Sequence, residues 1–67
     1  MDREKVAKRT ARLFKETRGL TKLSQPDFAK VINISKMHVH YIENGKRLPS
    51  IELYFRVSDL KDELTNG

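Results

Sequence analysis

Apolar and polar residues in the first part of the chain follow the three- and four-residue spacing of an amphipathic helix. Basic side chains fill the positions between the apolar ones, as expected of a helix with one buried and one solvated face. The positions predicted to point inward are Val6, Ala7, Thr10, Ala11, Leu13 and Phe14. Gly19 predicts the end of this helix, because glycine adopts the left-handed conformation of a helix C-terminus without a steric cost.

Two short helices are predicted next. Ser24 supplies an N-cap and Pro26 suits a first turn, so a helix begins at Gln25 and ends near Asn33, a residue type that tolerates positive φ. Ser35 then caps a helix at about 36–44, which the Asn-Gly pair at 44–45 ends. The apolar face of the first of these helices consists of Phe28, Ala29, Val31 and Ile32.

A fourth helix is predicted after the turn at 48–50, with Ser50 as its N-cap. Residues 61–64 either extend this helix or form a separate last turn, and residues 65–67 are predicted to be a frayed end. Since no segment shows the alternation of a strand, the predicted fold class is all-α, a compact domain of four to five helices. The apolar stripe of the fourth helix consists of Ile51, Tyr54, Phe55, Val57 and Leu60.

The second and third predicted helices fit a helix-turn-helix at about 25–44. This motif needs a small residue where the helices touch, a turn residue that tolerates positive φ, and apolar residues that hold the second helix of the motif. Counting from Gln25, the fifth residue is Ala29 and the ninth is Asn33. The fifteenth and eighteenth residues are Val39 and Ile42, which are predicted to point inward.

Several short stretches carry a family resemblance. They are Leu23-Ser24-Gln25, Ala29, Ser35, the run Tyr41-Ile42-Glu43-Asn44-Gly45-Lys46-Arg47, and Pro49-Ser50. Over residues 11–60 the chain resembles the Cro and phage-repressor type of helix-turn-helix, the xenobiotic-response-element family of bacterial and phage regulators. The resemblance implies a lambda-repressor-like fold and binding to DNA.

Three features depart from the family pattern. Asn33 replaces the turn glycine, residues 20–22 look like an insertion between the first two helices, and the Gly-Val-Ser link to a fifth helix is absent after Leu60. In the family the fifth helix often contributes to the dimer interface, so the mode of dimerisation stays open. The residues after Pro49 are the predicted dimer surface, with candidates Tyr54, Phe55 and Leu64.

The chain has 67 residues and no cysteine, which predicts a single domain over residues 1–67. Such a domain has little core around which to build a deep cleft, and no acid-base pair or nucleophile stands out, so no enzyme and no cofactor are expected. His38 and His40 lie about 200° apart on a helix and cannot share a metal ion. Without an apolar stretch of roughly 20 residues or a signal core, the expected location is the cytoplasm, on the nucleoid through DNA binding.

Charge is distributed unevenly along the chain, whose formal net charge is +5. Residues 1–22 carry +5, residues 23–47 carry +2, and residues 48–67 carry −2. Positive charge over the first two-thirds is the electrostatic footprint of a nucleic-acid binder. Charge alone also allows a basic helix that lies on a membrane surface.

At about 100° per residue, a third helix with Val39 and Ile42 buried presents one outward face. The residues of that face, which are the predicted base-contacting residues, are Lys36, Met37, His40 and Tyr41. The family resemblance implies that the first two residues after Ser35, together with Tyr41, meet base edges in the major groove. Lys36 would donate to guanine and Met37 would pack on a thymine methyl group. The alternative is that these side chains are only solvated.

Phosphate contacts are expected at the helix starts and in the loop after the third helix. Free amides and the helix dipole attract anions at a helix N-terminus, and members of the resembled family also use that loop. The predicted phosphate-contacting residues are Ser24, Gln25, Ser35, Asn44, Lys46 and Arg47. The alternative for the loop residues is that they cap and solvate the turn.

The resemblance also implies an ion pair between Glu43 and a basic residue of the first helix. Lys15 is the matching candidate, and Arg12 and Arg18 are the alternatives. Such a pair would hold the first helix against the third and has a structural role.

Together these observations predict a transcriptional regulator that binds double-stranded DNA sequence-specifically. The leading interpretation is a repressor that binds a palindromic operator as a homodimer. The alternative is a protein-interaction module that binds another repressor or a polymerase subunit through exposed apolar side chains. An antirepressor is a further candidate partner. No metal, cofactor or membrane is expected to take part.

Overall fold

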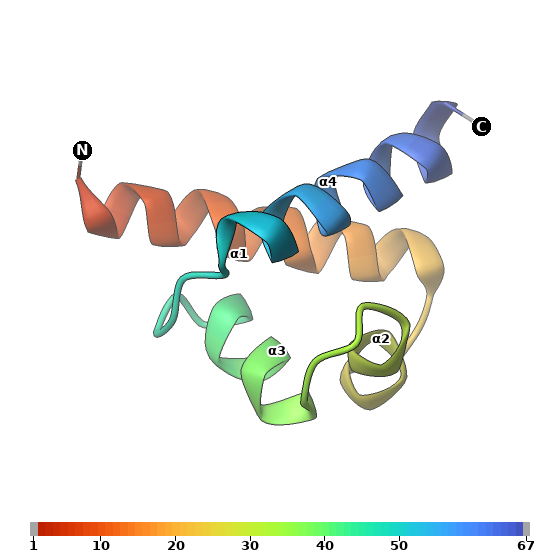
Figure 1. Ribbon diagram of the computed structural model, residues 1–67, viewed down its shortest axis with the longest axis horizontal. Helices are drawn as coiled ribbons and strands as arrows, with labels where there is room; N and C mark the ends of the chain where they lie inside the picture. The colour runs from red at the N-terminus through yellow and green to blue at the C-terminus, as the bar shows by residue number, and fades with distance from the viewer. Residues whose placement is uncertain (1, 67) are drawn as a thin grey trace.

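A computed structural model describes residues 2–66, which form four helices and no strand. The helices are α1 (Arg3–Thr21), α2 (Gln25–Val31), α3 (Lys36–Glu43) and α4 (Ile51–Asn66). The longest, α1, runs across the whole molecule, with α2 and α3 together on one side of it and α4 on the other (Figure 1). The all-α fold class predicted from the sequence is confirmed for the described residues.

One hydrophobic core joins all four helices. Phe14 of α1, Phe28 of α2, Ile42 of α3 and Val57 of α4 are all fully buried. Burial of each such side chain contributes about 1.5–3 kcal/mol to folding. The core therefore fixes the position of the two short helices, which are too short to be stable alone.

The first helix ends later than the sequence predicts. Gly19 lies within α1, and Lys22 is the residue that adopts the left-handed conformation, with φ 60°, and closes the helix. The Lys22 amide donates to the Arg18 and Gly19 carbonyl oxygens at 3.0 and 3.2 Å. Residues 20 and 21, predicted to belong to an insertion, are thus the last residues of a longer α1, and Lys22 is its C-cap.

The inward face of α4 also differs from the prediction. Leu53 and Val57 are buried, whereas Ile51 is 73% exposed, Phe55 is 55% exposed and Tyr54 is 38% exposed. Apolar residues lie on two faces of this helix, and only the face that contains positions 53 and 57 packs on the core. Assignment of Ile51, Tyr54 and Phe55 to the core stripe was therefore wrong.

The C-terminal part of α4 is one continuous helix. Residues 61–64 extend it rather than forming a separate turn, and Thr65 and Asn66, predicted to be frayed, belong to it as well. Position 67 of that predicted frayed end lies outside the described residues. The start of α4 is capped as expected, since the Ser50 hydroxyl accepts from the Leu53 amide at 3.1 Å.

Candidate nucleic-acid interface

A tight turn between α2 and α3 sets the direction of α3. Asn33 takes φ 60° in this turn, and the Ile34 amide donates to the Ala29 carbonyl oxygen at 3.0 Å. The Ser35 hydroxyl then caps α3 by accepting from the His38 amide at 3.1 Å. Ala29 is buried where the two helices meet. The small side chain and the left-handed asparagine are what allow the helices to meet at a short turn.

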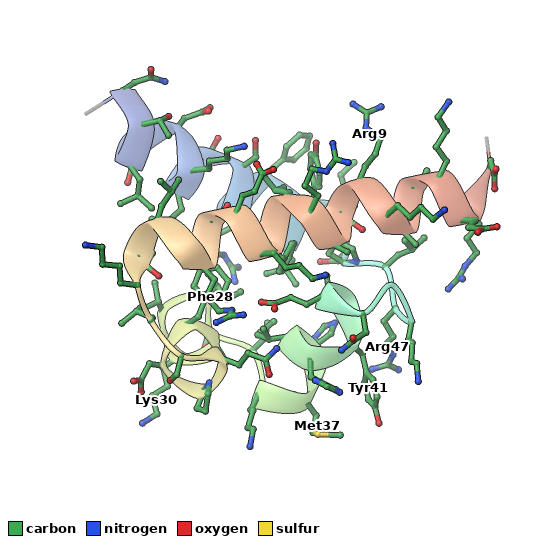
Figure 2. All side chains as sticks on the ribbon, turned by 180° about the vertical axis from the view of Figure 1, so that it is seen from behind. Arg9, Phe28, Lys30, Met37, Tyr41 and Arg47 are labelled. Atoms are coloured by element: carbon green, nitrogen blue, oxygen red, sulfur yellow. The ribbon has the colours of Figure 1, made fainter. Side chains whose placement is uncertain are left out.

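The inner side of α3 is held in the core, and its outer side faces solvent. Val39 and Ile42 are fully buried, whereas Met37 is 53% exposed. Figure 2 shows Met37 and Tyr41 pointing away from the domain on the same side. The outer face consists of the exposed Lys36, Met37 and His40 and the half-buried Tyr41.

Two rings of this outer face stand next to each other. The ring centroids of His40 and Tyr41 are 6.0 Å apart, and the ring planes are tilted by 54°. The Asn44 side-chain amide donates to the His40 carbonyl oxygen at 2.7 Å and its nitrogen lies 3.3 Å from the His40 Nδ1. Asn44 thus caps the end of α3 and supports the imidazole.

The loop after α3 folds back on the last turn of the helix. The Lys46 and Arg47 amides both donate to the Tyr41 carbonyl oxygen, at 2.9 and 3.3 Å. Gly45 makes this return with φ 72°, a conformation that costs glycine little. The side chains of Lys46 and Arg47 remain exposed, and Figure 2 shows Arg47 beside Tyr41. The loop therefore adds two basic side chains to the edge of the outer face.

A buried carboxylate ties α3 to the rest of the domain. Glu43 is only 3% exposed, and the Arg18 guanidinium donates to it twice, from Nε to Oε2 at 2.8 Å and from Nη2 to Oε1 at 3.0 Å. Gln25 Nε2 donates to the same Oε1 at 3.2 Å, and Arg18 Nη1 donates to the Leu23 carbonyl oxygen at 3.3 Å. This network links α1, the start of α2 and the end of α3.

The base that pairs with Glu43 is Arg18, so the prediction of Lys15 was wrong and its alternative Arg18 holds. Arg18 lies near the C-terminus of α1, where the Leu23 carbonyl oxygen accepts a further hydrogen bond from its guanidinium, while the Lys15 side chain is exposed. The hydrogen bond to Glu43 raises the pKa of Arg18 further, which outweighs the opposite effect of burial. The planar guanidinium matches a carboxylate with two parallel bonds, which an amine cannot do.

Arg56 was missed by the sequence analysis. Its Nη1 donates to the Ile32 carbonyl oxygen at 2.7 Å, and its Nη2 donates to Glu52 at 3.2 Å. The bond ties α4 to the carbonyl at the C-terminus of α2, next to the turn of the motif. Only the packing of α4 brings these residues together, because they are 24 positions apart in the chain.

Comparison with known protein families adds one match. A family model described as helix-turn-helix, of the Cro and phage-repressor type, matches residues 14–60, which is more than half of the chain. The chain belongs to this helix-turn-helix family. No curated protein and no solved structure matches it.

As a member of this family, the chain is a DNA-binding transcription regulator. The match includes α2, α3 and the loop that carries Lys46 and Arg47. The family is typically non-enzymatic. Within residues 2–66 of the regulator, no helix is long and apolar enough to cross a membrane, and no three His, Cys, Asp or Glu side chains gather to hold a metal ion.

Several residues predicted to contact phosphates in the regulator already have structural partners. The Ser24 and Ser35 hydroxyls accept from the Asp27 and His38 amides, at 3.4 and 3.1 Å. Gln25 uses one of its two amide N–H groups on Glu43. Each hydroxyl keeps its own proton, and Gln25 keeps a second N–H, so these groups can still donate to an anion.

Proposed function

We propose that this regulator is a repressor that binds a palindromic operator in double-stranded DNA as a homodimer, with α3 of each copy in the major groove. The observation that carries the proposal is the outer face of α3, which is held rigidly from behind. Val39 and Ile42 are fully buried on its inner side, and Glu43 is bonded to Arg18. A fixed backbone holds the outward side chains in position for discrimination between base edges.

Each side chain of the outer face has a role in this proposal. Lys36, at the exposed N-terminal corner of α3, donates to guanine O6 and N7, and Met37 packs on a thymine methyl group. His40 and Tyr41 extend the contact along the groove. Their neighbouring rings form the second turn of the outer face, next to Arg47.

Phosphate contacts position α3 in the groove. The exposed side chains of Lys46 and Arg47 follow the last turn of α3, and the N-termini of α2 and α3 add free backbone amides. Ser24, Gln25, Ser35 and Asn44 flank these positions. Such contacts release counterions from DNA, so binding weakens as salt rises. The regulator then acts on the DNA of the nucleoid, in the cytoplasm of a bacterium.

Selection of bound duplexes from a randomised DNA pool tests this proposal. The number of chains bound is then measured for each enriched duplex. Enrichment of a two-fold-symmetric site bound by two chains is expected, with half-sites about one helical turn apart. Salt-sensitive binding without any enrichment would contradict sequence readout. It would favour instead a module that binds an antirepressor or a polymerase subunit through its exposed apolar side chains.

A further inference from the structure

The first two turns of α4 and the loop before it expose an apolar surface that the core does not use. We call it the α4 apolar face, and its residues are Leu48, Ile51, Tyr54 and Phe55. Ile51 and Phe55 are one helical turn apart and are the most exposed of the four. The Tyr54 and Phe55 rings meet edge to face, with centroids 5.9 Å apart. In a domain this small, contiguous apolar surface of this kind marks an interaction site.

A groove lies directly beside these protruding side chains. It has a volume of about 450 Å³ and runs between the first half of α1 and the start of α4. Val6, Arg9 and Thr10 line it from α1, and Leu48, Pro49, Ile51 and Tyr54 line it from the other side. Protruding apolar side chains and an apolar groove thus share one surface. A two-fold dimer needs this kind of self-complementarity, because each copy presents both halves of the contact.

The charges around the face also complement each other. Past the apolar face, the exposed acidic side chains of α4 are Asp59, Asp62 and Glu63. The first half of α1 carries the exposed basic side chains Arg3, Lys5, Lys8, Arg9 and Arg12, of which Arg9 lines the groove and Lys8 lies instead beside the end of α3. In an antiparallel pair of copies, the acidic part of one α4 faces the basic part of the other α1. A parallel pair would place like charges together, so charge favours the antiparallel arrangement.

We propose that the partner of the α4 apolar face is a second copy of this chain, with the Ile51 and Phe55 side chains of each copy packed at the groove of the other. This inference rests on the proposed homodimer and names its surface. The face leaves the DNA-binding side free, since Figure 2 shows Arg9, which lines the groove, on the opposite side of the domain from Met37. Leu64, the third candidate from the sequence, lies outside this surface.

Sedimentation equilibrium of the isolated chain over a range of concentrations tests the proposal. The wild type should dimerise, and I51D and F55D should each raise the dimer dissociation constant about tenfold or more. Both side chains are exposed, so the variants should keep the helical circular dichroism of the wild type. The matched control is L64D, which adds the same charge to an exposed apolar position of the same helix and should leave dimerisation unchanged.

A charge variant tests the orientation of the two copies. R9E should weaken the dimer because it places an acid opposite the acidic part of the partner's α4, whereas R47E, on the DNA-binding side, should not. A wild type that stays monomeric, or I51D and F55D variants that dimerise like the wild type, would overturn the proposal. Equal weakening by L64D would overturn it as well, because the contact would then lie further along α4.

DNA binding separates this inference from the proposed function. If I51D dimerises poorly and loses tight binding to the palindrome but still prefers a single half-site, both proposals hold. If the wild type dimerises through this face but prefers no DNA sequence, the interface stands and the proposed function fails. If the wild type binds a symmetric site as a dimer that I51D and F55D do not weaken, the function stands and the interface lies elsewhere.

Discussion

At the scale of single residues, Glu43 is the group whose surroundings matter most for the account. A buried carboxylate is costly unless it is paired and hydrogen-bonded, and three donors from Arg18 and Gln25 satisfy it here. The network joins the end of α3 to α1 and to the start of α2. The network therefore helps to hold α3 in place. Its loss should lower the free energy of unfolding, which can be measured.

Removal of the Arg18 charge should destabilise the domain strongly. We expect R18M to lower the free energy of unfolding by about 3 kcal/mol, because Glu43 is left buried without its cation. Urea denaturation followed by circular dichroism measures this, with K15M as the matched control that changes little, since Lys15 is exposed. R18K should fall between the two, because an amine cannot bond both carboxylate oxygens in parallel. Equal effects of R18M and K15M would refute the assigned pair.

Two glycines should respond in opposite directions to the same substitution. G19A should stabilise the domain by about 1 kcal/mol, because Gly19 lies inside α1 with nothing within 4 Å of an added Cβ. G45A should destabilise the domain by about 1 kcal/mol or more, because Gly45 has φ 72°, a left-handed conformation that strains a residue with a Cβ. Thermal unfolding of the two variants side by side measures both. Stabilisation by G45A would mean that the loop after α3 has a different backbone.

At the scale of elements, α4 is held to α1 by the core and by one ion pair on the surface. Lys61 Nζ donates to Glu16 Oε2 at 2.9 Å. The hydrogen bond and the charge of Lys61 lower the pKa of Glu16 below its ordinary value. A carboxyl group whose pKa is lowered by folding stabilises the native state above its ordinary pKa and loses this contribution as the carboxylate is protonated.

The Lys61–Glu16 pair should therefore make the stability of the domain depend slightly on pH in the acidic range. The urea midpoint of the wild type should exceed that of K61M near neutral pH, and the difference should vanish as pH falls through the usual glutamate range, about 4. The effect is small because the pair is exposed. K5M, which removes an exposed lysine that forms no ion pair within residues 2–66, controls for the loss of positive charge. A difference that grows toward acid would show that Lys61 acts by another route.

The elements differ in how far the sequence could predict them. The starts of α2 and α3 were predictable because capping is local, and Ser24 and Ser35 accept from amides three residues ahead. The end of α1 could not be predicted from local sequence, because both Gly19 and Lys22 lie near it. The packing of the chain determines which of the two is the C-cap. On α4, hydrophobicity could not distinguish Leu53, which is buried, from Ile51, which is exposed.

The candidate site shows the same division between local and distant effects. The outer face of α3 follows from helical periodicity once Val39 and Ile42 are placed inside. The partner of Glu43 does not follow from periodicity, since α1 carries several basic residues. The angle between α1 and α3 determines which of them reaches Glu43. The bond from Arg56 to the Ile32 carbonyl oxygen joins two elements far apart in the chain. No local sequence pattern predicts such a contact.

At the scale of the whole molecule, we propose that two parts of one surface carry out separate tasks in DNA binding. In this proposal the outer face of α3 discriminates between base sequences, and the basic loop after it supplies attraction that is independent of sequence. The rest of the domain holds these parts in place through the core and the network around Glu43. The remaining basic charge of α1 adds to the long-range attraction for DNA.

The measurement that tests this division most directly is the affinity of M37A and R47A for the selected operator and for a scrambled duplex, over a series of salt concentrations. M37A should lower the ratio of the two affinities about tenfold, with an unchanged salt dependence. R47A should weaken binding to both duplexes similarly and reduce the slope of log affinity against log salt by about 1. An unchanged affinity ratio for M37A, together with a lowered ratio for R47A, would contradict the assignment of sequence readout to α3.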